Sequence, residues 1–522
     1  MSTTAESSPP WVDGLAGLVA AGVGVAAGQF VASVTDPTSG PVTAVGAVAV
    51  DLVPAWLKDW AIDTFGLWDK AVLVGVVLVG VGVLAWGCGL LGRSSPLRGL
   101  VALVGVGALG AAADLYRTDG ASFLLIPSLA AVVLTVVAYA VAVFLLHPSP
   151  EPRSASVRVS SEMAARPGDR QPSTPSGIDR RTFTVGGLAV LAASGVVVVV
   201  AGVPGPQTPV TLPRPAEPLA KLPAGLDTPG VAPLQTPQSD FFRIDIALAA
   251  PRVDPGDWRL AIDGMVDAPF SLTWEQLTAL PMVERDMTLA CVSNVVGGSL
   301  IGSGRWLGVE VAPLLRRARP RGGADQVLSR AADGFTASTP LEVLLDGRDA
   351  LIAIALDGEP LTRQHGAPAR LLVPGLYGYV GATKWLQSLS VSTFAEEQAY
   401  WTKRGWSERG EVKTSSRIDT PRARSAVPAG RVVLAGVAWA NHRGVAGVQA
   451  QVDGGPWQEA ELGDEVGVDY WRQWRLPVEL GRGVHRVQVR AVDATGAVQI
   501  ADPAPVVPDG ATGLHVVEFL CE

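Results

Sequence analysis

Residues Thr288 to Val309 read TLACVSNVVGGSLIGSGRWLGV. A strand-like segment ends at Cys291, and a glycine-rich turn follows it. A thiolate is a soft ligand that suits redox-active metals, and the end of a strand holds its sulfur in a fixed place. Cys291 is therefore a candidate metal ligand, although a lone cysteine is more often a buried core thiol, and these residues alone leave both interpretations open.

Other metal chemistry is limited by composition. The chain of 522 residues has 3 cysteines and 5 histidines, too few and too scattered for a disulfide framework or a zinc cluster. The formal net charge of −8 argues against a nucleic-acid partner, because no basic stripe is available to neutralise phosphates. A mean hydropathy of +0.30 with only 17% charged residues indicates a membrane part joined to a soluble part.

Three further segments accompany the cysteine stretch in the soluble half. They are FFRID at Phe241–Asp245 followed by DPGDWRL at Asp254–Leu260, HGAPARLLVPGLYG at His365–Gly378 followed by TKWL at Thr383–Leu386, and GVAGVQAQVDGGPW at Gly444–Trp457. In the last of these, Val448, Ala450 and Val452 alternate with glutamines before a turn, which is the period of a β-strand. The C-terminal segment is therefore expected to be a β-sandwich.

In this order the four segments resemble the sulfite oxidase family, from about Asp240 to the C-terminus. The resemblance implies an α+β molybdopterin-binding domain of sulfite oxidase type over 240–425 and an immunoglobulin-like, dimerisation-type β-sandwich over 428–522. It also implies a molybdenum-molybdopterin cofactor. The fold class expected for the whole chain is multi-domain, with N-terminal transmembrane helices before these two domains.

The resemblance carries residue roles onto this sequence. Cys291 would bind the metal, and Arg243 would line the substrate side as the second catalytic residue. A phosphate at the end of the pterin calls for cations and other donors. The residues expected to bind the cofactor are Phe241, Phe242, Arg243, Asp245, Asn294, His365, Arg370, Thr383 and Lys384.

The chain departs from the family pattern at two positions. Sulfite oxidases have an arginine five residues after the metal cysteine, where this chain has Val296, and a tyrosine where Trp406 aligns here. Charged hydrogen bonds contribute about 1.5–3 kcal/mol each, so losing them should weaken binding of a small dianion. Free sulfite is therefore not the expected substrate.

The N-terminal part, residues 1–147, is expected to be a four-helix membrane region, because four apolar runs lie in it. The runs are Gly14–Val34, Ala71–Gly92, Gly99–Ala113 and Ala121–Leu146. A fifth run at 183–203 is expected to be another transmembrane helix. These spans contain no histidine, which excludes bis-histidine haem ligation within them, and no haem is expected in this chain.

Arginine placement predicts the orientation. The Arg-rich segment 148–182 is expected to be a cytoplasmic linker, which puts the N-terminus inside and the catalytic domain outside a multi-pass cell-membrane protein. Arg180 and Arg181 stand just before the fifth run and resemble a twin-arginine export signal, although two positive-inside arginines would look the same. Residues 204–239, rich in proline, are expected to be an extended spacer rather than a packed element.

Together these features predict a membrane-anchored molybdenum-pterin oxidoreductase of bacterial type that catalyses two-electron oxygen-atom transfer. Its substrate would be an S-oxide or a sulfur oxyanion. Without a haem, electrons would pass to a separate partner, and the C-terminal sandwich would form a homodimer. The alternative is a catalytically inactive, membrane-tethered binding module that keeps the fold.

Overall fold

The computed structural model describes residues 9–35, 37–53, 57, 64, 69–117, 125–146, 190, 194 and 209–522. These residues form two compact units, of which the second holds Gln207–Ile246 and Val253–Glu522. The predicted linker at 148–182 and, apart from residues 190 and 194, the predicted fifth span at 183–203 lie outside the described residues.

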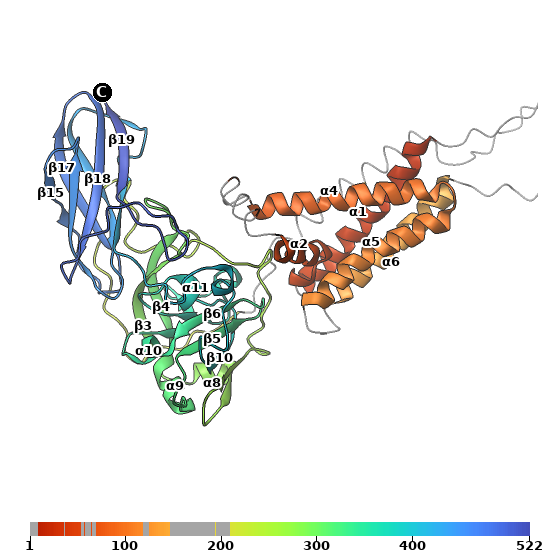
Figure 1. The fold of residues 1–522 in the computed structure, drawn as a ribbon, viewed down its shortest axis with the longest axis horizontal. Helices are drawn as coiled ribbons and strands as arrows, with labels where there is room; N and C mark the ends of the chain where they lie inside the picture. The colour runs from red at the N-terminus through yellow and green to blue at the C-terminus, as the bar shows by residue number, and fades with distance from the viewer. Residues whose placement is uncertain are drawn as a thin grey trace, which may run out of the picture. The chain divides into compact units, whose positions relative to one another are not determined.

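The first unit is helical (Figure 1). Its elements are α1 (Pro10–Val34), η1 (Pro37–Ser39), α2 (Pro41–Leu52), α4 (Asp69–Gly92), α5 (Pro96–Arg117) and α6 (Ile126–Leu146). Four helices are long and apolar enough to cross a membrane by length and composition, at Pro10–Val34, Lys70–Gly92, Pro96–Tyr116 and Ile126–Leu146. They correspond to the four predicted runs. The short helix α2 was not predicted from the sequence.

Small residues let these helices approach closely. Gly17 of α1 lies against the carbonyl of Ala85 in α4, where a Cβ would collide with backbone. A Cβ built on Gly24 of α1 would similarly lie only 2.5 Å from the carbonyl oxygen of Ala131 in α6. Packing through small residues is typical of helices that associate in a lipid environment.

The helices extend beyond the apolar runs and so include charged residues near their ends. Asp114, close to the end of α5, is 1% exposed and accepts a hydrogen bond of 2.7 Å from the hydroxyl of Ser128 in α6. A buried carboxylate needs such a donor, because an unpaired polar group in an apolar interior is costly. This pair connects α5 to α6.

The proline-rich segment forms neither helix nor strand from residue 209 to 239, but it is packed and is not a free spacer. From residue 209 it runs along the second unit without forming a helix or strand. The amide of Thr236 donates to the carbonyl of Ser303 at 2.8 Å, and the indole of Trp471 donates to the carbonyl of Leu234 at 2.7 Å. Leu234 is 9% exposed and belongs to the main core. Proline density predicted the backbone conformation, and these distant partners account for its packing.

The oxidoreductase domain contains two five-stranded sheets, ordered β2-β1-β10-β5-β6 and β3-β4-β7-β8 with β9 paired to β7. Its strands are β1 (Arg259–Gly264), β2 (Phe270–Thr273), β3 (Val283–Ala290), β4 (Ile301–Glu310), β5 (Gln326–Ala331), β6 (Thr336–Pro340), β7 (Leu351–Leu356), β8 (Glu359–Pro360), β9 (Arg370–Leu372) and β10 (Leu386–Ser392). Its helices are α8 (Trp274–Thr278), α9 (Val311–Ala318), α10 (Leu341–Leu345) and α11 (Gly378–Gly381), with the 3-10 turns η4 (Arg363–His365) and η5 (Thr402–Arg404). The α+β class is as expected.

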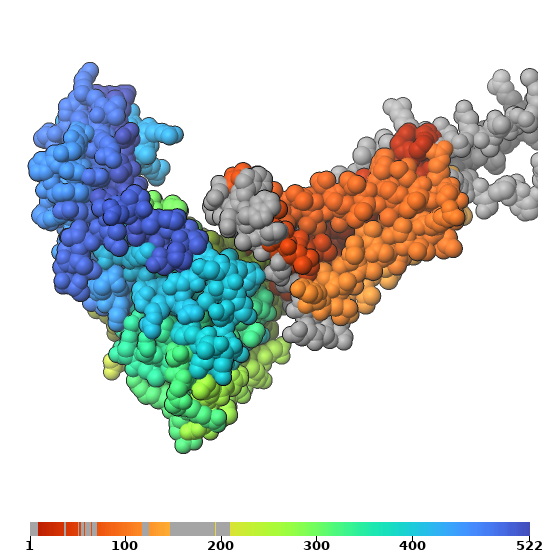
Figure 2. Space-filling model, viewed as in Figure 1, coloured from red at the N-terminus to blue at the C-terminus, as the bar shows by residue number. Residues whose placement is uncertain are grey.

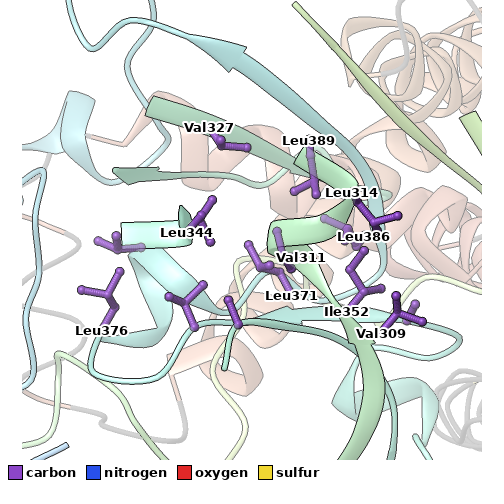
Figure 3. Close-up of a cluster of buried hydrophobic side chains, with 14 of the residues drawn as sticks. Val309, Val311, Leu314, Val327, Leu344, Ile352, Leu371, Leu376, Leu386 and Leu389 are labelled. Carbon is purple, nitrogen blue, oxygen red and sulfur yellow. The ribbon is translucent and has the colours of Figure 1, made fainter. Parts of the chain in front are cut away.

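Both sheets contribute to one core (Figure 3). Ile352 of β7 and Leu371 of β9 come from one sheet, and Val327 of β5 and Leu389 of β10 come from the other. Leu314 of α9 packs in the same cluster and is 4% exposed. Burying such side chains stabilises the domain by about 1.5–3 kcal/mol each and fixes the strand ends that carry the candidate site.

The C-terminal domain is a two-sheet sandwich, with strand orders β11-β13-β17-β16 and β12-β19-β18-β14-β15. The strands are β11 (Ser415–Thr420), β12 (Ala426–Val427), β13 (Gly430–Trp439), β14 (Val445–Val452), β15 (Trp457–Glu459), β16 (Glu461–Leu462), β17 (Arg472–Leu480), β18 (Gly483–Asp493) and β19 (His515–Cys521). Because β11 pairs with β13, the sandwich begins at Ser415 and not at the predicted residue 428. The polar sequence of β11, SSRIDT, hides it from a search for apolar alternation.

The two domains of the second unit are packed together (Figure 2). The amide of Thr288 in β3 donates to the carbonyl of Asp469 at 2.8 Å. The hydroxyl of Thr288 accepts from the amide of Trp471 at 2.7 Å, and the side chain of Asn441 donates to the Thr288 carbonyl at 2.8 Å. The strand that leads to Cys291 is therefore bonded directly to the C-terminal domain.

Candidate functional site

Cys291 lies directly after β3, as the sequence predicted. Its amide donates to the carbonyl of Leu300 at 3.0 Å, and its carbonyl accepts from the amide of Asn294 at 3.1 Å. The residue is 8% exposed, and burial raises the pKa of its thiol above the ordinary value. The sulfur is therefore protonated at neutral pH, and binding a metal would release that proton.

The loop after Cys291 is folded by Asn294. Its side-chain oxygen accepts a hydrogen bond of 2.9 Å from the amide of Leu300. The amide of Gly298 donates to the carbonyl of Val295 at 2.8 Å within the same loop. Asn294 was predicted to bind the cofactor. In the structure its side-chain oxygen, Oδ1, closes the turn that returns the chain to β4.

His365 is neutral and oriented by two hydrogen bonds. Its Nε2 lies 3.2 Å from the carbonyl of Phe241, which can only accept, so Nε2 carries the proton. Its Nδ1 lies 2.7 Å from the hydroxyl of Thr362, which donates to it. Burial lowers the pKa of His365 to about 4, and the charge of Arg370 acts in the same direction. The ring therefore acts as a fixed neutral donor at physiological pH.

Arg370 is a buried cation. It is 5% exposed, and its guanidinium donates to the carbonyl of His365 at 3.1 Å and to that of Ala382 at 3.5 Å. Its Nε has no hydrogen-bond partner, and no ion pair found among the described residues includes it. Burial lowers its pKa to about 10. A desolvated guanidinium with an unused N–H group could bind an anion such as a phosphate.

Lys384 and Asp245 bind each other. The Lys384 Nζ lies 2.5 Å from Asp245 Oδ2 and 3.2 Å from the carbonyl of Gln364. Both residues were predicted to bind the cofactor separately, and in this structure each satisfies part of the other's hydrogen-bonding capacity. The pair lies next to the His365 turn through Gln364.

Asp333, which was not predicted, belongs to the same neighbourhood. It lies in the turn between β5 and β6, and the charges of Asp245 and Lys384 both affect its pKa, which burial raises. Its Oδ1 accepts from the amide of Phe335 at 3.0 Å, whereas its buried Oδ2 has no partner. An unused buried acceptor fits a ligand with N–H groups.

The remaining predicted residues take different surroundings. Phe241 is buried with its ring centroid 5.6 Å from that of Trp306, and Phe242 stacks on Phe241 at 5.6 Å. Thr383 is fully buried, with its hydroxyl 2.6 Å from that of Ser329. Arg243 is exposed, and its charge contributes to lowering the pKa of His365.

The predicted residues thus converge on one region. Phe241, His365 and Arg370 are joined by hydrogen bonds through backbone carbonyls. Cys291 follows β3, whose Met287 and Leu289 pack in the same apolar cluster as Phe241. Phe241, His365 and Arg370 therefore lie together, and the strand that precedes Cys291 packs in the apolar cluster that contains Phe241.

The aromatic residues near the site differ from the expectation in one respect. Trp406, aligned with the family tyrosine, packs with its ring centroid 5.7 Å from Tyr379 and 6.0 Å from Trp401. Tyr377 is a buried phenol. Burial raises the pKa of Tyr377 to about 12, and the charge of a Cys291 thiolate would raise it in the same direction. A phenol is thus present near the cysteine, contributed by the segment VPGLYG.

Comparison with known proteins gives consistent matches to this region. An oxidoreductase molybdopterin binding domain model matches residues 247–401. The chain is 29% identical to mitochondrial sulfite oxidase of Rattus norvegicus over 320 residues, which span 52% of this chain and 58% of that protein. It is 33% identical over 165 residues to the uncharacterized oxidoreductase YuiH of Bacillus subtilis, covering 32% of this chain and 80% of that protein.

Among solved structures, the crystal structure of the sulfane dehydrogenase SoxCD from Paracoccus pantotrophus aligns over 71% of this chain and 96% of its own. The TM-score is 0.48 and the sequence identity is 21%.

Proposed function

Because this chain belongs to the sulfite oxidase family of molybdopterin-dependent oxidoreductases, we propose that it catalyses two-electron oxygen-atom transfer at a sulfur-centred group. The observations that carry the proposal are the buried thiol of Cys291 directly after β3 and the buried guanidinium of Arg370, which has no ion pair among the described residues. The inactive binding module considered from the sequence is not favoured, since the chain is an oxidoreductase by family.

The residues present fit the cofactor. Arg370 has an unused donor and no acidic partner among the described residues, which suits the phosphate of the pterin. Asp333 has an unused buried acceptor, which suits the N–H groups of the pterin ring. Cys291 supplies a single soft sulfur ligand. Molybdenum held by the pterin dithiolene supplies oxygen-atom transfer coupled to a two-electron redox change.

The protein's own groups would then position the reactants. Cys291 would bind the metal after losing its proton, and the hydrogen bonds of its backbone to Leu300 and Asn294 would fix the sulfur. His365 is neutral, and both of its ring nitrogens are hydrogen-bonded within the protein. It could donate to a ligand only by breaking its bond to the Phe241 carbonyl. Its role would therefore be to hold the Phe241 segment beside the cofactor. Arg243, which is exposed, would bind an oxygen of the substrate.

We propose an S-oxide in preference to free sulfite. Val296 stands at the position that aligns with a family arginine. Its Cγ2 would lie 3.6 Å from a Cβ built on Gly513, so Val296 lies next to residues of the C-terminal domain. An apolar side chain there offers no hydrogen bond to a dianion, whereas it tolerates the organic part of an S-oxide.

Introducing the missing cation tests this preference. Val296→Arg is expected to raise kcat/KM for sulfite oxidation by about 10–100-fold, the equivalent of one charged hydrogen bond. Steady-state assays with artificial electron acceptors and donors would compare sulfite oxidation with S-oxide reduction in one preparation. Val295→Arg, with the same charge on a side chain that is 58% exposed, is the matched control and should change neither rate by more than about threefold. Efficient sulfite oxidation by the unaltered protein would contradict the proposal.

We further propose that the helical unit anchors the enzyme in the cell membrane, with the catalytic domain on the extracytoplasmic side. The four long apolar helices support anchoring. Electrons would reach or leave the site through a separate partner. The C-terminal sandwich would be of immunoglobulin type and would pair with a second copy.

Export of the folded domain would depend on the twin-arginine pair. Arg180→Lys combined with Arg181→Lys is expected to leave most of the domain on the cytoplasmic side, because lysine preserves the positive charge and removes the specific signal. Protease added to spheroplasts would cleave the exported domain of the unaltered chain and leave that of the variant intact. Equal cleavage of both would mean that the two arginines act only through their charge.

A further inference from the structure

The loop that follows the metal cysteine is held from outside by the C-terminal domain. Arg417, in β11, donates from its guanidinium to the carbonyl of Gly298 at 2.9 Å. Gly298 lies in the turn between Cys291 and β4, and its own amide bonds within the loop to Val295. The contact joins two residues 119 positions apart in the chain.

Arg417 is itself fixed by a carboxylate. Its Nε lies 2.6 Å from Asp419 Oδ1, and the two side chains are 12% and 9% exposed. The second oxygen of Asp419 accepts from the amide of Ala232 in the proline-rich segment at 2.9 Å. A guanidinium held in this way donates in a defined direction, so the position of the Gly298 carbonyl is defined too.

A second side chain from the sandwich contacts Gly297, the residue that precedes Gly298 in the loop. The imidazole of His515, at the start of β19, lies directly against Gly297, and a Cβ at Gly297 would collide with the ring. The amide of Ile418 donates to His515 Nδ1 at 2.9 Å, which fixes the ring plane. Gly297 also has a φ of +77°, a conformation that favours glycine.

We infer that Arg417 and His515 are positioning residues that hold the loop after Cys291 and thereby fix the sulfur that binds the metal. Two side chains of the C-terminal domain would then position the metal ligand from outside its loop. This inference rests on the proposed role of Cys291, but its first test does not require the metal.

The first test measures the reactivity of Cys291 in the full chain, purified in detergent from a host that makes no molybdopterin. Alkylation by iodoacetamide would be followed by mass spectrometry of the peptide that contains Cys291. Arg417→Ala is expected to raise the rate at least about tenfold, the factor that corresponds to loss of about 1.4 kcal/mol of loop ordering. Arg417→Lys should restore part of the protection, because an ammonium still donates to the Gly298 carbonyl.

Arg472→Ala is the matched control. Arg472 also donates to backbone carbonyls, at 3.0 Å to Gly463 and Val445, but both of these acceptors lie within the C-terminal domain and neither belongs to the cysteine loop. Its removal should leave the alkylation rate of Cys291 within about twofold of the unaltered protein. Equal rates for the Arg417→Ala and Arg472→Ala variants would overturn the inference.

A second variant and a second measurement cover the case in which Arg417→Ala does not fold. His515→Ala removes the other contact and should also speed alkylation. In protein loaded with cofactor, both variants should retain molybdenum but change the electron paramagnetic resonance spectrum of molybdenum(V), because the angle at the cysteine sulfur is no longer fixed. Unchanged spectra would contradict a positioning role. If the unaltered protein bound no molybdenum, the proposed function would be wrong. The alkylation rates, measured without cofactor, would still show whether Arg417 and His515 hold the loop.

Discussion

Cys291→Ser is expected to lower turnover by at least about 10³-fold, which corresponds to about 4 kcal/mol of transition-state stabilisation. Serine has nearly the same shape, so the backbone bonds of residue 291 to Leu300 and Asn294 should persist. A hydroxyl is a harder and far less acidic ligand than a thiol, and it does not replace a thiolate on a redox-active metal. Elemental analysis and steady-state kinetics on the full chain would measure molybdenum content and turnover together, with about one molybdenum per chain expected before substitution.

Cys521→Ser provides the control. Cys521 is also a free, buried cysteine, at 1% exposure, but it lies in the core of the C-terminal sandwich. Its replacement should lower stability by about 1 kcal/mol through a buried hydroxyl and leave kcat within about twofold. Full turnover and full molybdenum content in the Cys291→Ser variant would show that Cys291 is a structural thiol.

The parts of the candidate site that the sequence can indicate are those that are local in the chain. The position of Cys291 follows from a strand that ends before a glycine-rich turn, and both features lie within one short stretch. His365, Arg370 and Lys384 lie within 20 residues of one another, and the turns between them bring them together. Because the resemblance covers these motifs as continuous segments, the cluster could be predicted without knowing the sheet order.

Groups that arrive from distant segments could not be predicted in this way. Asp333 lies in an Asp-Gly turn between two strands, which is ordinary turn chemistry, and its place near Lys384 depends on the pairing of β5 with β10. His515 comes from the C-terminal domain that the sequence suggested was separate, and Arg417, which lies within the range predicted for the oxidoreductase domain, belongs to the same sandwich through β11. Nothing in their local sequence indicates a contact with Gly297 or Gly298, because that contact depends on how β11 and β19 pack against the cysteine loop.

The packed course of the proline-rich segment has the same origin. Proline density reports on backbone conformation, and the segment forms neither helix nor strand from residue 209 to 239. Three of its partners, Ser303, Asp419 and Trp471, lie 67, 187 and 237 positions away in the chain. A pattern within a segment predicts which conformation it adopts but not which surface it lies on.

Arg370→Met is expected to have opposite effects on stability and on cofactor binding. Burial lowers the pKa of Arg370 from 12.5 to about 10, so keeping the guanidinium charged in the cofactor-free protein costs about 3 kcal/mol. Its two hydrogen bonds to backbone carbonyls offset part of that cost. Methionine fills a similar volume without charge, and the cofactor-free full chain should therefore become more stable by about 2 kcal/mol.

The same substitution removes the cation that would bind the pterin phosphate. Losing two charged hydrogen bonds of about 1.5–3 kcal/mol each should lower cofactor retention by at least about 100-fold. Thermal unfolding followed by tryptophan fluorescence would give the effect on stability, and molybdenum content after gel filtration would give the effect on cofactor retention.

Arg305→Met is the control for a general effect of removing an arginine, because Arg305 is paired with Asp286 at 2.8 Å. Its loss leaves a carboxylate that is 12% exposed without its partner, which should destabilise the protein by about 2 kcal/mol. If Arg370→Met were as destabilising as Arg305→Met, Arg370 would be a structural cation satisfied by the protein, and the phosphate site would have to lie elsewhere.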